Sequence, residues 1–221
     1  MSKRALTILA VACAVIALLS IFLIDRPLAT AVHGSGIENA TFVVKLREFF
    51  DIFTGRFYGR GLVGNYVGLA QLLLGILFIV VGAIWTLARR GSRIGPGLAF
   101  AGVVQLATIE TAWQVKDLFG RLRPFEVFKN GNWDHVWFAG GTSFPSGHNA
   151  FFWGLFLPLV YAFPRWRIPL LIVPVFIAFA RIDESYHFLS DVLAGIALAA
   201  LITLLGAVVF GRWVKPSAHR A

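Results

Sequence analysis

The stretch VLAGIALAALITLLGAVVF, residues 192–210, contains no charged side chain. Its length is close to the roughly 20 apolar residues that a membrane-spanning helix needs. Five further apolar runs occur along the chain: Ala5–Ile24, Leu62–Ala88, Ile94–Val115, Ser146–Pro164 and Ile168–Ala180. The six runs predict an all-α fold, a bundle of six transmembrane helices.

The composition of the 221 residues agrees with a membrane protein. Hydrophobic residues make up 58% of the chain and charged residues 14%, whereas soluble domains contain about 25% charged residues. A soluble, disordered or collagen-like chain is therefore excluded, and the length predicts one domain over residues 1–221. The single cysteine, Cys13, excludes a disulfide framework or a cysteine-based metal site within one chain.

The net charge of +9 is explained by orientation in the membrane. If the N-terminus lies inside, the inner segments contain basic residues and no acidic ones: Lys3, Arg4, Arg89, Arg90, Arg93, Arg165, Arg167, Arg212, Lys215 and Arg220. This is the positive-inside distribution. The basic excess thus indicates topology, and we expect no nucleic-acid partner.

Two segments near the N-terminus allow alternatives. Lys3 and Arg4 precede the first apolar run and Ala29-Thr30-Ala31 resembles a cleavage site, so a cleaved signal peptide is one interpretation. The run Ala5–Ile24 is longer than the roughly 7–15 residues of a signal core, which favours a retained span.

Residues 38–60 have phenylalanines at helical spacing opposite charged residues, which predicts an amphipathic helix in the outer interface. It would serve as a lid, or pack as a cap on the bundle.

Three polar clusters lie at the predicted outer ends of spans, where ionisable groups indicate function. In the first, KDLFGRLRP, Lys116 and Arg123 are seven residues apart, so a continuing helix would place them on one face, with Pro124 as its boundary. Two cations on one face suit an anion with several oxygens. The alternative is that both side chains reach lipid phosphates.

The second cluster, Pro145-Ser146-Gly147-His148, opens the fourth run. Free N–H groups and the positive end of the helix dipole make such a start an anion site. Gly147 permits close approach of the backbone, and His148 is placed to exchange a proton there. The alternative is a helix cap with an interfacial histidine.

The third cluster is RIDESYHFLSD, residues 181–191. His187 and Asp191 are four residues apart, so on the first turns of a helix the carboxylate would accept a hydrogen bond from one ring nitrogen. The other nitrogen would then be free to attack an electrophile. A buried histidine–aspartate pair that joins two helices is the alternative.

Together these clusters form K-x6-RP, PSGH and R-x5-H-x3-D, in that order, and the chain from Lys116 to Asp191 resembles the type 2 phosphatidic acid phosphatase family. The resemblance implies a helical core, about residues 94–210, with the active site at one membrane face. It implies that His187 attacks phosphorus, Asp191 orients His187, and His148 protonates the leaving oxygen and later activates water. The phosphate-binding residues would be Lys116, Arg123, Ser146, Gly147 and Arg181, and no metal or other cofactor would be needed.

One position departs from the family pattern. Ala180 stands where the family often has serine before the third-motif arginine, so one phosphate hydrogen bond would be missing. Asp183 and Glu184 would hold Arg181 or Arg121, or recognise a cationic part of a head group. Glu110, within the third span, would be the buried partner of a polar neighbour or part of a proton relay.

The expected function is therefore a lipid phosphatase in a bacterial inner membrane, with its site on the periplasmic face. Its partners would be membrane lipids and a lipid phosphate substrate: phosphatidylglycerol phosphate, phosphatidic acid, polyprenyl diphosphate or a lipid A phosphate. Two alternatives are a vanadate-dependent haloperoxidase-like enzyme, whose motifs are shared, and an anion transporter. The sequence does not choose among the lipids or fix an oligomeric state.

Overall fold

The computed structural model describes residues 1–35, 44–45, 64–183 and 185–214. Within these ranges it contains helices and no strands, which confirms the all-α prediction. The helices are α1 (Lys3–Leu23), α2 (Asp25–Ser35), α4 (Gly64–Ala88), α5 (Ile94–Phe119), α6 (Pro124–Asn130), α7 (Gly147–Ala162), α8 (Arg167–Asp183) and α9 (Leu189–Val214), with a 3-10 turn, η2 (Pro164–Trp166), between α7 and α8.

Four segments in the described part of the chain are long and apolar enough to cross a membrane: Lys3–Leu23, Gln71–Ala88, Leu189–Val214 and Ile94–Asn130, the last of which contains α5, a turn and α6. Each of the six apolar runs forms a helix, but α7 and α8 have only 16 and 17 residues. The structure therefore supports four spans, and the count of six remains a prediction. The predicted interfacial helix at 38–60 lies outside the described residues, apart from residues 44 and 45.

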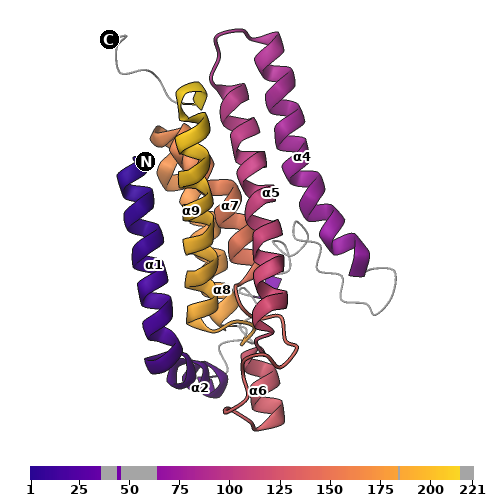
Figure 1. Ribbon diagram of the computed structural model, residues 1–221, viewed down its shortest axis with the longest axis vertical. Helices are drawn as coiled ribbons and strands as arrows, with labels where there is room; N and C mark the ends of the chain where they lie inside the picture. The colour runs from indigo at the N-terminus through magenta and orange to yellow at the C-terminus, as the bar shows by residue number, and fades with distance from the viewer. Residues whose placement is uncertain (36–43, 46–63, 184, 215–221) are drawn as a thin grey trace.

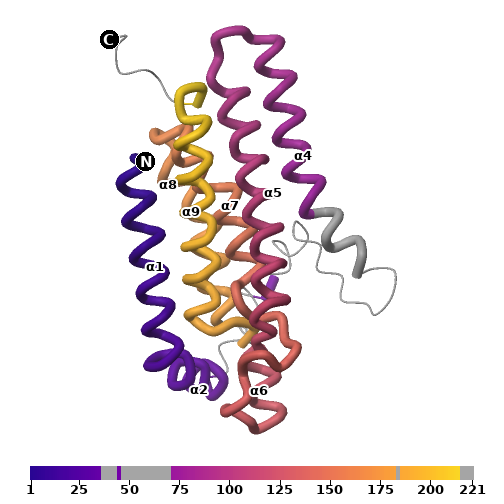
Figure 2. Tube along the Cα trace, in the orientation of Figure 1, coloured from indigo at the N-terminus to yellow at the C-terminus, as the bar shows by residue number. Residues whose placement is uncertain are grey.

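The helices pack as a bundle along one long axis (Figure 1). α5, α7 and α9 contact one another, while α1 packs along α9 and α4 along α5. Buried apolar side chains join these helices; Leu6 of α1, for example, shares a cluster with Phe100 and Ala207. The trace in Figure 2 shows α4 at the edge of the bundle. Exposed leucine, isoleucine and valine side chains along α1, α4 and α9 suit contact with lipid.

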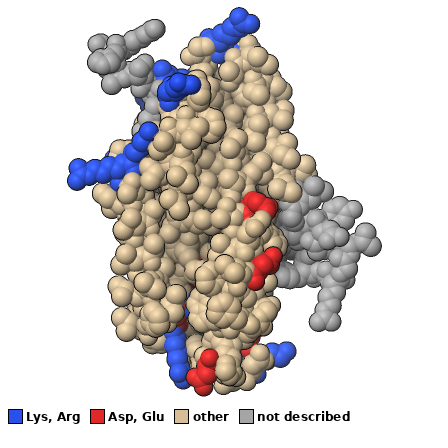
Figure 3. All heavy atoms as spheres, in the orientation of Figure 1, with Lys and Arg blue, Asp and Glu red and all other residues tan. Residues whose placement is uncertain are grey.

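The two ends of the bundle differ in charge. In this view Lys and Arg side chains appear at both ends, with more of them at the end where α9 finishes and α4 turns into α5, and Asp and Glu appear from the middle of the bundle to the end that contains α6 (Figures 1 and 3). The short helices α2 and α6 lie at the opposite end, away from the C-terminal end of α9 (Figure 1). We call this the α2–α6 end, and it contains the residues described next.

Candidate active site

Lys116 and Arg123 do not lie on one continuous helix, contrary to the sequence-based expectation. α5 ends at Phe119 because Gly120 adopts a left-handed conformation, with φ 50°, and its N–H donates to the carbonyl of Lys116. Arg123 is extended and caps the next helix, α6, in which Pro124 is the first residue. The chain therefore turns between the two cations.

The loop before α7 packs directly on this turn. Leu122 N–H donates to Val136 O (2.9 Å), Ala139 N–H donates to Gly120 O (3.0 Å), and Ser143 N–H donates to Arg121 O (2.8 Å). A Cβ atom on Gly141 would lie 2.2 Å from Arg121 O, so only glycine permits this approach. These contacts fix the backbone that presents Thr142 and Ser143.

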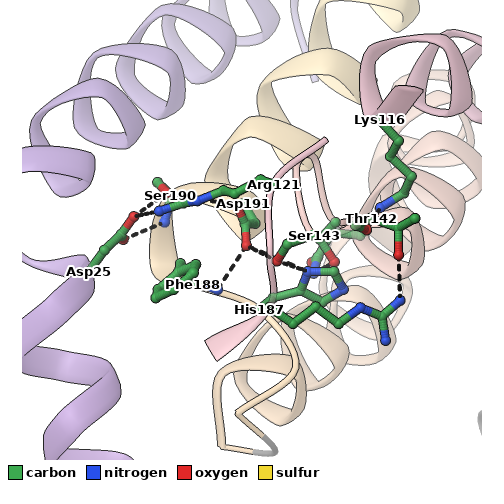
Figure 4. Close-up of polar contacts among 12 residues, drawn as sticks. Asp25, Lys116, Arg121, Thr142, Ser143, His187, Phe188, Ser190 and Asp191 are labelled. Atoms are coloured by element: carbon green, nitrogen blue, oxygen red, sulfur yellow. Dashed lines mark hydrogen bonds and ion pairs between the residues drawn. The ribbon is translucent and has the colours of Figure 1, made fainter. Parts of the chain in front are cut away.

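Thr142 links the two cations of the first motif (Figure 4). Lys116 Nζ donates to the carbonyl of Thr142 (2.6 Å), and Arg123 Nη2 donates to its hydroxyl (3.2 Å). Lys116 also lies against the start of α7, because a Cβ atom on Gly147 would be 3.4 Å from Lys116 Cε. The structure thus brings the first and second motifs together.

The N-terminus of α7 is attached to the N-terminus of α9. Ser146 N–H donates to Asp191 O (2.9 Å), and the Ser146 hydroxyl accepts a hydrogen bond from Asn149 (3.1 Å). His148 lies in the first turn of α7 and is half-buried. The first-turn N–H groups and His148 therefore sit beside the end of α9 that bears Asp191, at the positive end of the α7 dipole.

His187 and Asp191 are close, but not as neighbours on a helix face. His187 precedes α9, which begins at Leu189. Asp191 Oδ2 accepts from the N–H of Phe188 (2.9 Å), so this carboxylate caps its own helix. His187 Nδ1 lies 3.7 Å from Asp191 Oδ2. The distance is longer than a hydrogen bond because the cap holds the carboxylate beside the turn.

The hydroxyl of Ser143 lies between these two side chains (Figure 4). It donates to Asp191 Oδ2 (2.5 Å) and is 3.4 Å from His187 Nδ1. Among the described residues, none forms a hydrogen bond with the other ring nitrogen of His187, Nε2. The geometry therefore leaves Nε2 available and holds Nδ1 toward a hydroxyl and a carboxylate.

His187 is neutral in this environment. Its side chain is 4% exposed, and burial lowers the pKa of His187 from 6.5 to about 3. The positive charges of Lys116 and Arg123 also lower this pKa, whereas Asp191 raises it. A neutral imidazole is the form that can act as a nucleophile.

Arg181, the remaining cation of the third motif, is almost completely buried, with 1% of its surface exposed. It lies near the end of α8, which extends through Arg181 to Asp183, as expected from the short apolar run. The carbonyl of Arg181 accepts a hydrogen bond from the N–H of His187 (3.1 Å). The backbone of the third motif thus fixes the nucleophile candidate directly to α8.

Residues 94–215 match the PAP2 superfamily. The chain belongs to the PAP2 superfamily. A Lipid A 1-phosphatase from Rhizobium johnstonii is 34% identical over 101 residues, and one from Rhizobium etli is 32% identical over 101 residues. These alignments span 44% of this chain and only 41% and 44% of the two relatives. No solved structure matches the chain significantly.

The superfamily match and the two relatives named Lipid A 1-phosphatase make a phosphatase activity the first hypothesis for this chain. Within the described ranges, no group of three or more His, Cys, Asp or Glu side chains is arranged to hold a metal ion. The residues predicted from the motifs lie at the α2–α6 end. They belong to α5, to the turn after it, to α7 and the residue before it, to α8, to the loop before α9 and to α9 itself. The match begins at α5 and therefore leaves α1, α2 and α4 outside it.

The sequence analysis missed a buried ion cluster beside the PAP2 motifs. Arg121 donates to Asp191 Oδ1 (2.6 Å) and to Asp25 Oδ2 (2.7 Å). Asp25 and Asp191 thus hold Arg121; the expected roles of Asp183 and Glu184 concern side chains outside the described part of the chain. An acidic residue directly after a charge-free apolar run was the signal for Asp25.

Glu110 differs from its expected burial, and Ser143 was not predicted as a site residue. Glu110 is exposed, not buried, and its carboxylate accepts a hydrogen bond from Gln114 one turn later (2.8 Å). Ser143 was not singled out, because a serine in a loop has no pattern that places it beside a histidine 44 residues away. Only the folded loop brings its hydroxyl to the third motif.

Proposed function

We propose that this protein hydrolyses a phosphate monoester or diphosphate of a membrane lipid through a phosphohistidine intermediate. The observation that supports it most is the position of His187, which is buried beside Ser143 and Asp191 and has its pKa lowered by burial and by the charges of Lys116 and Arg123. The candidate substrates are phosphatidylglycerol phosphate, phosphatidic acid, polyprenyl diphosphate and a lipid A phosphate. The two relatives named Lipid A 1-phosphatase make lipid A 1-phosphate the first to test.

In the first step His187 Nε2 attacks phosphorus, and the bond between phosphorus and the leaving oxygen breaks. His148 gives its proton to that oxygen, so the dephosphorylated lipid leaves as a neutral alcohol or, from a diphosphate, as a phosphate. In the second step His148 takes a proton from water, the hydroxide attacks phosphorus, and the bond to Nε2 breaks. Inorganic phosphate leaves and both histidines return to their starting forms.

The phosphoryl oxygens would be held by Lys116, Arg123 and Arg181, and by donors at Ser146 and Gly147 on the start of α7. In the structure Thr142 accepts hydrogen bonds from Lys116 and Arg123. A phosphate group would replace these two contacts with stronger, charge-assisted ones. Phosphoryl transfer depends mainly on such positioning and charge stabilisation, so the site needs no metal for this chemistry.

We place the site on the periplasmic face of a bacterial inner membrane. The α2–α6 end lies opposite the end that contains the turn between α4 and α5, where Arg89, Arg90 and Arg93 lie (Figure 1). Basic ends of membrane proteins face the cytoplasm. In this arrangement α7 and α8 also cross the bilayer; α8, with 17 residues, is about 26 Å long at 1.5 Å per residue, close to the hydrocarbon thickness of about 30 Å.

The test is phosphate release from the detergent-solubilised protein in EDTA, across a panel of phospholipid, isoprenoid and lipid A phosphates. We expect turnover without added metal, inhibition by vanadate, and loss of turnover in His187→Ala. His135→Ala is the matched control, since His135 is an exposed loop histidine in the same half of the bundle. Normal turnover by His187→Ala, or activity that chelation removes and Mg²⁺ restores, would overturn the mechanism.

A further inference from the structure

Asp25, the first residue of α2, lies outside the region that matches the PAP2 superfamily. It is nevertheless 3% exposed and makes three polar contacts. Its carboxylate accepts from Arg121 Nη2 (2.7 Å), from Ser190 N–H (3.0 Å) and from the Ser190 hydroxyl. Asp25 therefore joins the first part of the chain to the N-terminus of α9.

Arg121 is shared by two carboxylates on opposite sides (Figure 4). Its Nη1 donates to Asp191 Oδ1 (2.6 Å) and its Nη2 to Asp25. The other oxygen of Asp191, Oδ2, faces Ser143 and His187. A continuous path of polar contacts thus runs from Asp25 through Arg121 and Asp191 to the side of the imidazole that bears Nδ1.

The charges along this path explain why two carboxylates are present. A lone Arg121 at 2.6 Å would largely neutralise Asp191, because charges in a buried site interact strongly. The imidazole becomes positive when Nε2 bonds to phosphorus and Nδ1 keeps its proton, and it then needs a net negative partner. Asp25 supplies the second negative charge, so Asp191 keeps its effect on His187.

We propose that Asp25 is a positioning residue for the reaction: through Arg121 it holds Asp191 in place and preserves the negative charge that stabilises the phosphorylated imidazole. This inference rests on the proposed phosphatase function. It assigns to α2 a part in catalysis in addition to packing. The contact from Ser190 N–H fixes the first turn of α9 and hence the direction of Asp191.

The test compares Asp25→Asn with Asp134→Asn, an equal change of charge at an exposed loop position. We expect Asp25→Asn to lower kcat about 10- to 100-fold, the usual effect of losing a partner that orients a functional side chain. KM should stay within about twofold, because Asp25 does not touch the substrate. Asp25→Glu should recover part of kcat, and Asp134→Asn should equal the wild type.

Single-turnover labelling locates the effect. Phosphorylation of His187 should slow in Asp25→Asn, while the thermal midpoint in detergent changes far less than the rate. If Asp25→Asn does not accumulate in the membrane, Asp25→Glu gives the test alone, since it keeps the charge and displaces it by one methylene. A wild-type kcat in the folded variant tested, or an increase in KM alone, would overturn the proposal.

A measurement without turnover separates this inference from the proposed function. The ¹⁵N ring shifts of His187 should change in Asp25→Asn and remain the same in Asp134→Asn. Unchanged shifts in Asp25→Asn overturn the positioning role, even if the wild type hydrolyses lipid phosphates. Wild-type protein that releases no phosphate from any substrate contradicts the proposed function instead, and the ring shifts still decide whether Asp25 acts on His187.

Discussion

Replacing Arg121 by methionine would remove the central charge of the ion cluster and keep much of the side-chain volume. The guanidinium donates to Asp25, Ser190 and Asp191 at 2.6–2.7 Å. It also lies over the rings of Trp137 (4.3 Å) and Phe188 (4.1 Å). The variant would leave two buried carboxylates, 3% and 0% exposed, without their shared cation.

The expected loss of stability follows from this geometry. Breaking one buried ion pair by removing a single partner costs about 3–5 kcal/mol. Because one cation serves two acids here, we expect a value at the upper end of that range. A change of 1 kcal/mol shifts the midpoint by about 2–4 °C in a chain of this size, so the thermal midpoint should fall by roughly 10–20 °C. Arg121→Lys keeps the positive charge but loses the planar guanidinium that contacts both carboxylates, so its thermal midpoint should fall less than that of Arg121→Met.

Thermal unfolding in one detergent, followed by circular dichroism, measures the effect. Arg123→Met is the matched control: Arg123 is only partly buried, and its guanidinium contacts a threonine hydroxyl at 3.2 Å and the ring of Tyr186 at 5.3 Å, so its loss should shift the midpoint by a few degrees at most. The double variant Asp25→Asn, Arg121→Met should have a higher thermal midpoint than Arg121→Met alone, since it has one unpaired buried charge fewer. An Arg121→Met midpoint within about 3 °C of the wild type would refute the assignment of Arg121 as the cluster's centre.

Three further outcomes follow from the site. Ser143→Ala should lower kcat about 10- to 100-fold, because a hydrogen bond to a charged group contributes about 1.5–3 kcal/mol. Ser35→Ala, at an exposed serine of α2, is the control, and an unchanged kcat in Ser143→Ala would exclude the bridge. Since the pKa of His187 is lowered to about 3, the ring should stay neutral as pH falls from 8 to 5, and its protonation should reduce folding stability only as pH falls from about 6.5 toward 3; a ring-nitrogen titration near 6.5 by NMR would contradict this. Long-chain lipid phosphates should be cleaved much faster than glycerol phosphate because tail contacts position the head group, whereas equal kcat/KM in the same detergent would argue against access from the lipid side.

The sequence predicted the helices well and the turns at the site poorly. A charge-free run such as 192–210 has one stable structure in lipid, a helix, since every backbone group must be paired internally. The motifs likewise indicated which side chains meet at the α2–α6 end. The end of α5 at Phe119 was missed because the left-handed Gly120 and the loop packed on it are tertiary features.

The placement of His187 shows a second reason. Spacing of four residues predicted a helical pair, but Asp191 accepts the N–H of Phe188, and this cap starts the helix after His187. The carboxylate of Asp191 can accept from a backbone N–H or from the imidazole, and local competition between these donors decides its position. A rule based on residue spacing does not include this competition. Ser143 and Asp25 act only through contacts between distant segments, so no local pattern indicated their partners.

The cluster at Asp25 has a consequence for how the protein is made. Asp25 and Ser190 are 165 residues apart in the sequence, yet they share hydrogen bonds at the N-terminus of α9. Synthesis proceeds from the N-terminus, so α1, α2 and α5 are present in the membrane before α9 exists. The contacts of Arg121 with Ser190 and Asp191, and of Asp25 with Ser190, form only when α9 packs against the rest of the bundle. Before α9 is released, a nascent chain can form the contact between Asp25 and Arg121, whereas the contact between Arg121 and Asp191 must wait until α9 has packed.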